Sequence, residues 1–193
     1  YKRFLVGKPN ILPLADRFNL VKQKQLTIRL HDHGLMRLIP IASDEDLFNQ
    51  THKIFFHSLI NSIVYKGMFF DHFSQKSDDK HGPFLLKTIE PKDFTLVRNK
   101  KFKEEIIQLV SSPKWSCPPI TKEKLTDVKE LLKHLVTDES QCYFLEKCLT
   151  FNSSSQEAIV YEHEWSHSLT SYYEYVIRDP ERNKVFLLII TYE

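Results

Sequence analysis

Residues 26–39 read LTIRLHDHGLMRLI, and this stretch decides how the N-terminal part of the chain folds. Before the turn residues 31–34 (His-Asp-His-Gly), apolar side chains alternate with polar ones, as in a half-buried strand. After the turn, residues 35–39 supply a second strand. We therefore predict an antiparallel hairpin. Pro40 has no backbone N–H, and we expect it to end the second strand.

A helix is predicted to follow the hairpin. Ser43 is suited to be its N-cap, and the acids at 44–46 would place negative charge in its first turn. Apolar residues recur at helical spacing up to a predicted end near Gly67. They are Leu47, Phe48, Ile54, Phe55, Leu59 and Ile63.

Positive charge is concentrated at the N-terminal end. The whole chain has a formal charge of only +2, but residues 1–40 contain eight Lys and Arg against two acids, a balance of +6. Such a block can face nucleic acid, membrane headgroups or an acidic protein. A solvated face without a partner is the alternative.

The composition is that of a globular protein. The 193 residues are enough for one domain or two small ones, and 41% of them are hydrophobic. No run approaches the roughly 18 apolar residues of a membrane span. The first residue is Tyr1 and no signal pattern follows, which indicates a fragment of a longer protein. Cys117, Cys142 and Cys148 form no C-x-x-C pair, so we expect reduced thiols in the cytoplasm or nucleus.

The remaining pattern predicts an α+β fold, with a small mixed or antiparallel sheet, packed helices and a β-rich C-terminal segment. Strands are expected over 84–89, 93–97, 172–177 and 185–192, the last two as a hairpin. Helices are expected over 100–110 and after a Thr121 cap. Prolines 113, 118 and 119 mark a boundary. The expected divisions are residues 1–112, a helical connector over 113–151, and the β-rich segment over 152–193.

Residues 163–167 read His-Glu-Trp-Ser-His and match the H-E-x-x-H zinc-peptidase pattern. Chelation by His163 and His167 requires a helix, because in a strand the two side chains would stand roughly 13 Å apart. The surrounding β-branched and aromatic residues favour a strand or loop. We therefore expect no metal, and a zinc peptidase is a minor alternative. With no glycine cluster for phosphate and no nucleophile elbow, we expect neither a cofactor nor a catalytic site.

Several stretches, in order, resemble the platform and PAZ region of Dicer-family ribonucleases. Residues 7–9 (Gly-Lys-Pro) precede a lead-in with Pro13 and Phe18, then the strand 26–30. The helix that carries His52, Phe56 and Leu59 follows. Residues 84–107, with the run Lys-Phe-Lys-Glu-Glu-Ile at 101–106, look like the end of that platform. Residues 158–176 are similar to the opening strands of the PAZ domain. The resemblance covers about two thirds of the chain.

This resemblance implies a module that anchors the end of double-stranded RNA, gripping a 5′ phosphate and a 3′ overhang. Cleavage in that family belongs to ribonuclease III domains, whose acidic signature is missing here. Two positions depart from the family pattern. Asn61 stands where an arginine can lie near the end of the platform helix, and Glu164-Trp165 replaces an expected Tyr-Arg pair.

We therefore expect a non-catalytic RNA-binding module whose partners are double-stranded RNA ends and other domains of its parent chain, with no membrane association. A protein-interaction scaffold that docks an acidic partner is the main alternative. The residues expected at the RNA are Lys22, Lys24, Arg29, Arg37, His57, Trp165, Tyr173 and Tyr175.

Overall fold

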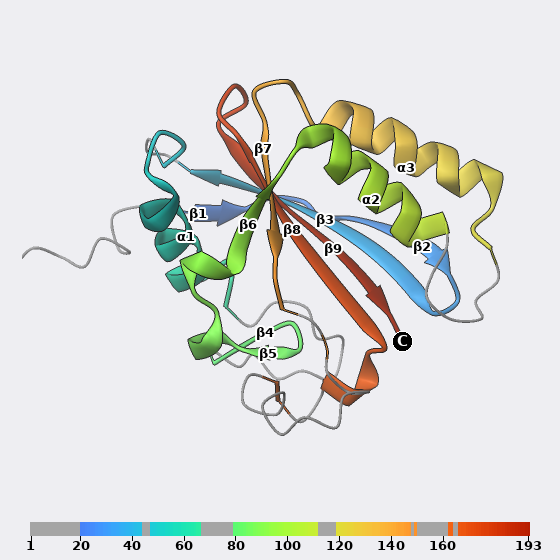
Figure 1. The fold of residues 1–193 in the computed structure, drawn as a ribbon, viewed down its shortest axis with the longest axis horizontal. Coiled ribbons are helices and arrows are strands. Elements are labelled where there is room, and N and C mark those ends of the chain that lie inside the picture. The colour runs from blue at the N-terminus through green and yellow to red at the C-terminus, as the bar shows by residue number, and fades with distance from the viewer. Residues whose placement is uncertain are drawn as a thin grey trace, which may run out of the picture.

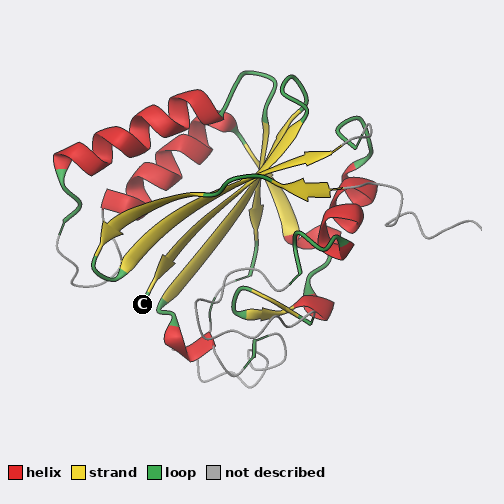
Figure 2. Ribbon diagram, turned by 180° about the vertical axis from the view of Figure 1, so that it is seen from behind, coloured by secondary structure: helices red, strands yellow, loops and turns green. Residues whose placement is uncertain are grey.

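The computed structural model describes residues 20–43, 47–66, 79–111, 119–147, 149, 162–163 and 166–193. Within them the chain is α+β, as predicted, with three α-helices, a seven-stranded sheet and a two-stranded sheet (Figures 1 and 2). The large sheet contains β1 (Leu20–Lys22), β2 (Leu26–His31), β3 (Gly34–Ser43), β6 (Phe94–Val97), β7 (Gln141–Leu145), β8 (Ser171–Asp179) and β9 (Lys184–Tyr192). The small sheet pairs β4 (Lys80–His81) with β5 (Phe84–Leu85), and the helices are α1 (His52–Asn61), α2 (Asn99–Ser111) and α3 (Lys122–Leu135).

The predicted N-terminal hairpin is confirmed, with Leu26 opposite Leu38. Its second strand is longer than predicted, because Pro40 does not end it and β3 continues to Ser43. The Gln23 N–H donates to the Pro40 carbonyl at 2.8 Å. Since the N–H and C=O of one strand residue point to the same side, the N–H that Pro40 lacks would face the gap between β1 and β2. The proline therefore costs the sheet no hydrogen bond to β9.

The predicted C-terminal hairpin is also confirmed, and it lies in the middle of the large sheet. The strand order is β1-β3-β9-β8-β7-β6, with β2 also paired to β3. Strands from all three predicted divisions therefore share one sheet. The division 113–151 was predicted to be a helical connector; it also contains β7, which joins β6 to β8.

The central strands are buried on both faces of this sheet. Along β9, Val185, Leu187 and Ile189 pack into one hydrophobic cluster with α1, and we call this side the α1 face. The alternate residues, from Phe186 to Ile190, pack into a second cluster with α2 and α3 on the opposite face. A strand covered on both faces reads as a continuous apolar run, as residues 185–190 (VFLLII) do. The molecule is thus layered, with the sheet between α1 and the α2–α3 pair (Figure 1).

The helix α1 begins later than predicted. Thr51 is its N-cap, and the Thr51 hydroxyl accepts a hydrogen bond from the Ile54 N–H at 3.5 Å. Ser43, the predicted cap, is the last residue of β3, where it lies opposite Leu20. The acids at 44–46 lie outside the described residues.

Leu47 and Phe48 belong to a turn before α1 rather than to the helix itself. Both are buried in the core on the α1 face. The buried Arg178 guanidinium donates to the Phe48 carbonyl and, at 2.8 Å, to the Gln50 carbonyl. Those carbonyls are therefore engaged with β8 and do not accept bonds within a helix.

The other two helices are confirmed. Thr121 caps α3 as predicted, with its hydroxyl accepting a bond from the Lys124 N–H at 3.3 Å. The predicted strand over 84–89 is wrong beyond Leu85, because a 3₁₀ turn, η2 (Leu86–Thr88), follows β5. Among the described residues, none of the helices has both the length and the apolar character of a membrane span.

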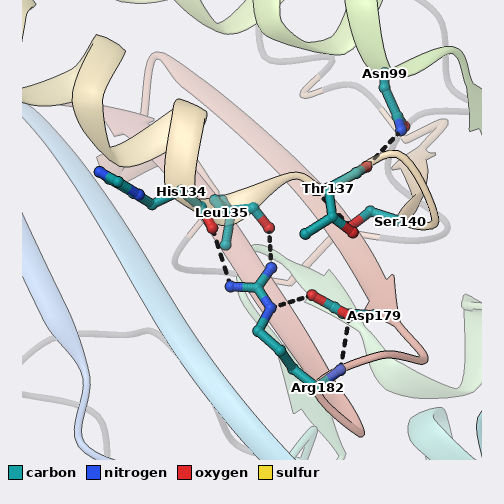
Figure 3. A network of polar contacts seen from close by, with 7 residues as sticks. All are labelled: Asn99, His134, Leu135, Thr137, Ser140, Asp179 and Arg182. Atoms are coloured by element: carbon teal, nitrogen blue, oxygen red, sulfur yellow. Dashed lines mark hydrogen bonds and ion pairs between the residues drawn. The ribbon is translucent and has the colours of Figure 1, made fainter.

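A polar network ties the turn between β8 and β9 to the end of α3 (Figure 3). Arg182 pairs with the fully buried Asp179 carboxylate and donates to the His134 and Leu135 carbonyls that end the helix. Helix C-termini leave carbonyls unsatisfied and favour cations. Arg182 therefore caps α3 from another element.

Candidate nucleic-acid interface

Three of the four cations expected at RNA project from the α1 face of the sheet. Lys22 is paired with Ile41 and Arg37 with Ile189, and both partners belong to the core on the α1 face. Arg29 is paired with the residue two positions before Arg37 on β3. Directly paired residues, and residues two apart on a strand, share a face of the sheet.

Three of the four predicted cations lie at one edge of the sheet, whereas Arg37 lies on β3, between β2 and β9. Lys22, Lys24 and Arg29 are exposed, and Lys24 lies in the gap between β1 and β2. Within the part of the chain that the structure describes, none of these three forms an ion pair. Their charge is therefore available to an anionic partner.

The expected aromatic contacts lie on the other side. Tyr175 packs on the α2–α3 face, where its ring meets Phe102 edge-on at 5.2 Å between centroids. It is only 3% exposed and offers no surface for stacking a base. Tyr173 is half-buried on the same face, and Trp165 lies outside the described residues. The structure therefore does not bring the tyrosines together with the cations.

His57, the remaining predicted contact, lines a pocket on the outer side of α1. The cavity has a volume of about 520 Å³ and lies between the end of α1 and the segment around η2. Cavities of this size accommodate small molecules. Its lining consists of His57, Ile60, Asn61, Lys66, Asp79, Leu86, Lys87, Ile89, Glu90 and Pro91.

The two acids of this lining have interaction partners, whereas its two lysines form no ion pair with any described residue. Glu90 forms an ion pair with Lys92, which lowers the pKa of the Glu90 carboxyl, and Asp79 also has an interaction partner. Lys66 and Lys87 have no ion pair with any described residue. The two lysines are therefore the groups of this lining that can pair with an anionic ligand.

His57 of the pocket is contacted by the side chain of Asn61, one turn later on α1. The Asn61 side-chain amide donates to the His57 carbonyl at 2.8 Å and lies 3.5 Å from His57 Nδ1. If Nδ1 accepts from that amide, the neutral ring carries its proton on Nε2 and presents a donor. Asn61 thus contributes by orienting His57, although it brings no charge of its own.

A buried polar cluster lies on the α1 face of β8. Glu174 accepts hydrogen bonds from the Tyr172 hydroxyl at 2.6 Å and from the Tyr65 hydroxyl at 2.7 Å. His81 Nε2 lies 2.6 Å from the same carboxylate, and His81 Nδ1 lies 2.7 Å from the Tyr65 carbonyl. The Tyr65 and His81 rings stack with 3.6 Å between centroids.

The ionisable groups of this cluster are buried away from solvent. His81 Nδ1 donates to the Tyr65 carbonyl, and Nε2 of the same ring faces the Glu174 carboxylate. Burial by itself would raise the pKa of Glu174, but the charge of His81 and the hydrogen bonds from His81, Tyr172 and Tyr65 together lower it. Burial and the Glu174 charge raise the pKa of both tyrosines. No group of this cluster is exposed enough to act on a substrate.

The H-E-x-x-H motif does not form a continuous α-helix. Glu162 forms an isolated bridge with Phe84, and residues 166–168 form a 3₁₀ turn, η5 (Ser166–Ser168). His163 is buried, and its Nε2 lies 2.7 Å from the Gly82 carbonyl, to which it donates. The side chain of His167 lies outside the described residues. Among those described, no three potential ligands gather as a metal site would require. This geometry gives the zinc-peptidase hypothesis no support.

His57 was among the predicted contacts, whereas Lys66 and Lys87, which line the same pocket, were not. Lys66 and Lys87 are distant in sequence and follow no shared motif. Glu174 was not among the predicted site residues either. The available signal was an acid between two tyrosines in an otherwise apolar strand, which implies a buried and paired charge. Comparison of the chain with family models, with curated proteins and with solved structures found no match.

Proposed function

We propose that this chain is a non-catalytic module that binds the end of double-stranded RNA, as the platform and PAZ region of a Dicer-like ribonuclease would. The pocket beside α1 carries this proposal. Lys66, Lys87 and His57 are donors suited to a terminal phosphate, and the two lysines form no ion pair with any described residue. The apolar part of the lining, such as Ile89 and Pro91, suits the sugar or base beside that phosphate.

The exposed cations of the N-terminal strands would contact the RNA backbone. Lys22, Lys24 and Arg29 lack ion-pair partners among the described residues, and phosphate contacts of this kind are independent of sequence. This role fits a module that recognises a shape and an end rather than a base order.

The tyrosines have a smaller part in this proposal than the sequence suggested. Tyr173 and Tyr175 lie on the face opposite the cations, so RNA held on the α1 face would not reach them. Other domains of the parent chain would then supply the grip on the 3′ end and the cleavage. We place the module in the cytoplasm or nucleus, consistent with the free thiol of the buried Cys142.

The test is a titration of a 5′-phosphorylated RNA duplex by fluorescence anisotropy at two salt concentrations. We expect affinity to fall with salt, and the double variant Lys66→Ala/Lys87→Ala to reduce the slope of log K against log salt by about 2. The control is Lys129→Ala/Lys133→Ala, which removes two exposed lysines of α3. An affinity that does not depend on salt, or no binding, would reject RNA binding.

One observation favours the scaffold alternative. Large apolar side chains are exposed on the outer strands, with Val21 52%, Leu26 45% and Leu96 62% accessible. Outer strands that expose both backbone groups and apolar side chains can accept a strand from another protein. If the titration shows no RNA binding and the wild type instead retains an acidic β-strand peptide, this alternative replaces the first.

A further inference from the structure

We infer that Glu174 and His81 are positioning residues for the pocket: this buried, hydrogen-bonded pair fixes the two chain segments that carry Lys66 and Lys87. Neither residue lines the pocket, so both would act through their neighbours. The inference rests on the proposed function only in taking this pocket as the binding site.

The first segment is the turn that follows α1, residues 62–66. Tyr65 directly precedes Lys66 and is attached to the cluster at both of its ends. Its hydroxyl donates to Glu174 at 2.7 Å, and its carbonyl accepts from His81 at 2.7 Å. The backbone next to Lys66 is therefore held by the buried pair.

The second segment is the small hairpin of β4 and β5 with η2 after it. His81 belongs to β4 and is bonded through Nε2 to Glu174 at 2.6 Å. The Leu86 N–H donates to the Asp79 carbonyl at 2.8 Å, which ties the residue before Lys87 to the residue before β4. Lys87 is thus connected to the buried pair through one closed hairpin.

Neither segment has enough regular structure to hold itself in place. β4 and β5 contain two residues each, and such a pair is not stable alone. Glu174, in contrast, belongs to β8, which pairs with β9 along its whole length. The carboxylate is therefore the rigid point, and the two segments are attached to it.

The hairpin also packs against the cluster without room for a side chain. Gly82, at its turn, has φ +51°, and an added Cβ would lie 2.7 Å from the Tyr172 hydroxyl. A glycine is required there for both reasons. Contact this close transmits a displacement of the cluster to the hairpin.

Two matched variants separate positioning from stability. Tyr65→Phe removes a buried hydroxyl that donates to Glu174, and Tyr192→Phe removes one that donates to the Leu109 carbonyl of α2, away from the pocket. Only Tyr65 belongs to a segment that carries a pocket lysine. The measurements are melting temperature, amide hydrogen exchange over residues 62–66 and 79–89, and affinity for the 5′-phosphorylated RNA duplex.

We expect both variants to lower the melting temperature comparably. Only Tyr65→Phe should speed exchange in the two segments and weaken RNA binding, on the order of fivefold. Glu174→Gln should also speed amide hydrogen exchange in the two segments. If this variant does not fold, the comparison of the two tyrosine variants still tests the inference.

The outcomes distinguish this inference from the proposed function. Equal exchange and equal affinity in the two tyrosine variants, with normal RNA binding by the wild type, would overturn positioning and leave the function standing. Faster exchange in Tyr65→Phe alone, with no RNA binding by the wild type, would support positioning and reject the function.

Discussion

His31, at the turn of the first hairpin, is a buried histidine with only half of its polar capacity used. Its Nδ1 accepts a hydrogen bond from the His33 N–H at 3.1 Å, while its buried Nε2 has no partner among the described residues. The ring stacks on Tyr192 with 5.3 Å between centroids. Burial lowers the pKa of His31, as do His33 and Lys124, and Asp32 opposes them only in part.

This environment predicts a dependence of stability on pH. The folded state disfavours the protonated ring, which would also lose the bond at Nδ1, while the unfolded chain protonates with a pKa of about 6.5. The contribution of the neutral His31 ring to the free energy of unfolding is therefore complete above that pKa and is lost as the pH falls below it. His31→Phe keeps a ring on Tyr192 and removes the titration.

Urea denaturation between about pH 7.5 and pH 5 checks this expectation. The wild type should lose stability more steeply than His31→Phe as the pH falls. His134→Gln, at an exposed histidine of α3, should keep the wild-type slope. Identical slopes for the wild type and His31→Phe would show that His31 does not contribute.

At the scale of elements, features encoded locally were predictable. The alternation over 26–30 identified a hairpin strand, and Thr121 marked the start of α3 because a threonine hydroxyl caps the N–H three residues later. Features decided by partners distant in sequence were not. Arg178 engages the carbonyls before α1, so the helix begins at His52 rather than after Ser43.

The link between Arg182 and α3 leads to a prediction at this scale. Arg182→Ala removes the donors to the end of the helix and leaves the buried Asp179 carboxylate without its cation. We expect a loss of about 2 to 3 kcal/mol in the free energy of unfolding. Urea denaturation measures it.

Glu181→Ala, at the exposed neighbouring position, is the control and should change stability by less than about 0.5 kcal/mol. Asp179→Asn in the Arg182→Ala background should recover part of the loss, because the uncompensated charge is then removed. Equal effects of Arg182→Ala and Glu181→Ala would show that the network does not stabilise the turn.

At the scale of the whole molecule, the sheet decides which predicted contacts can act together. Parity along β8 places Tyr175 on the α2–α3 face and Glu174 on the α1 face. Composition alone does not reveal this separation, because both residues lie in one β-rich run. The pocket could not be predicted from the sequence either, because its lining combines the end of α1 with the segment around η2, which are separate along the chain. Of the basic residues within 1–40 that the structure describes, Lys22, Lys24 and Arg29 are exposed at one edge of the sheet.

The most direct test of RNA-end binding compares one 5′-phosphorylated RNA duplex with the same duplex closed by a loop at each end. Binding through the pocket requires a free end, so the wild type should prefer the open duplex by about tenfold or more, which corresponds to about 1.4 kcal/mol. Lys66→Ala/Lys87→Ala should abolish that preference while retaining the salt-dependent affinity for both duplexes. Equal affinity of the wild type for the open and the closed duplex would contradict end recognition.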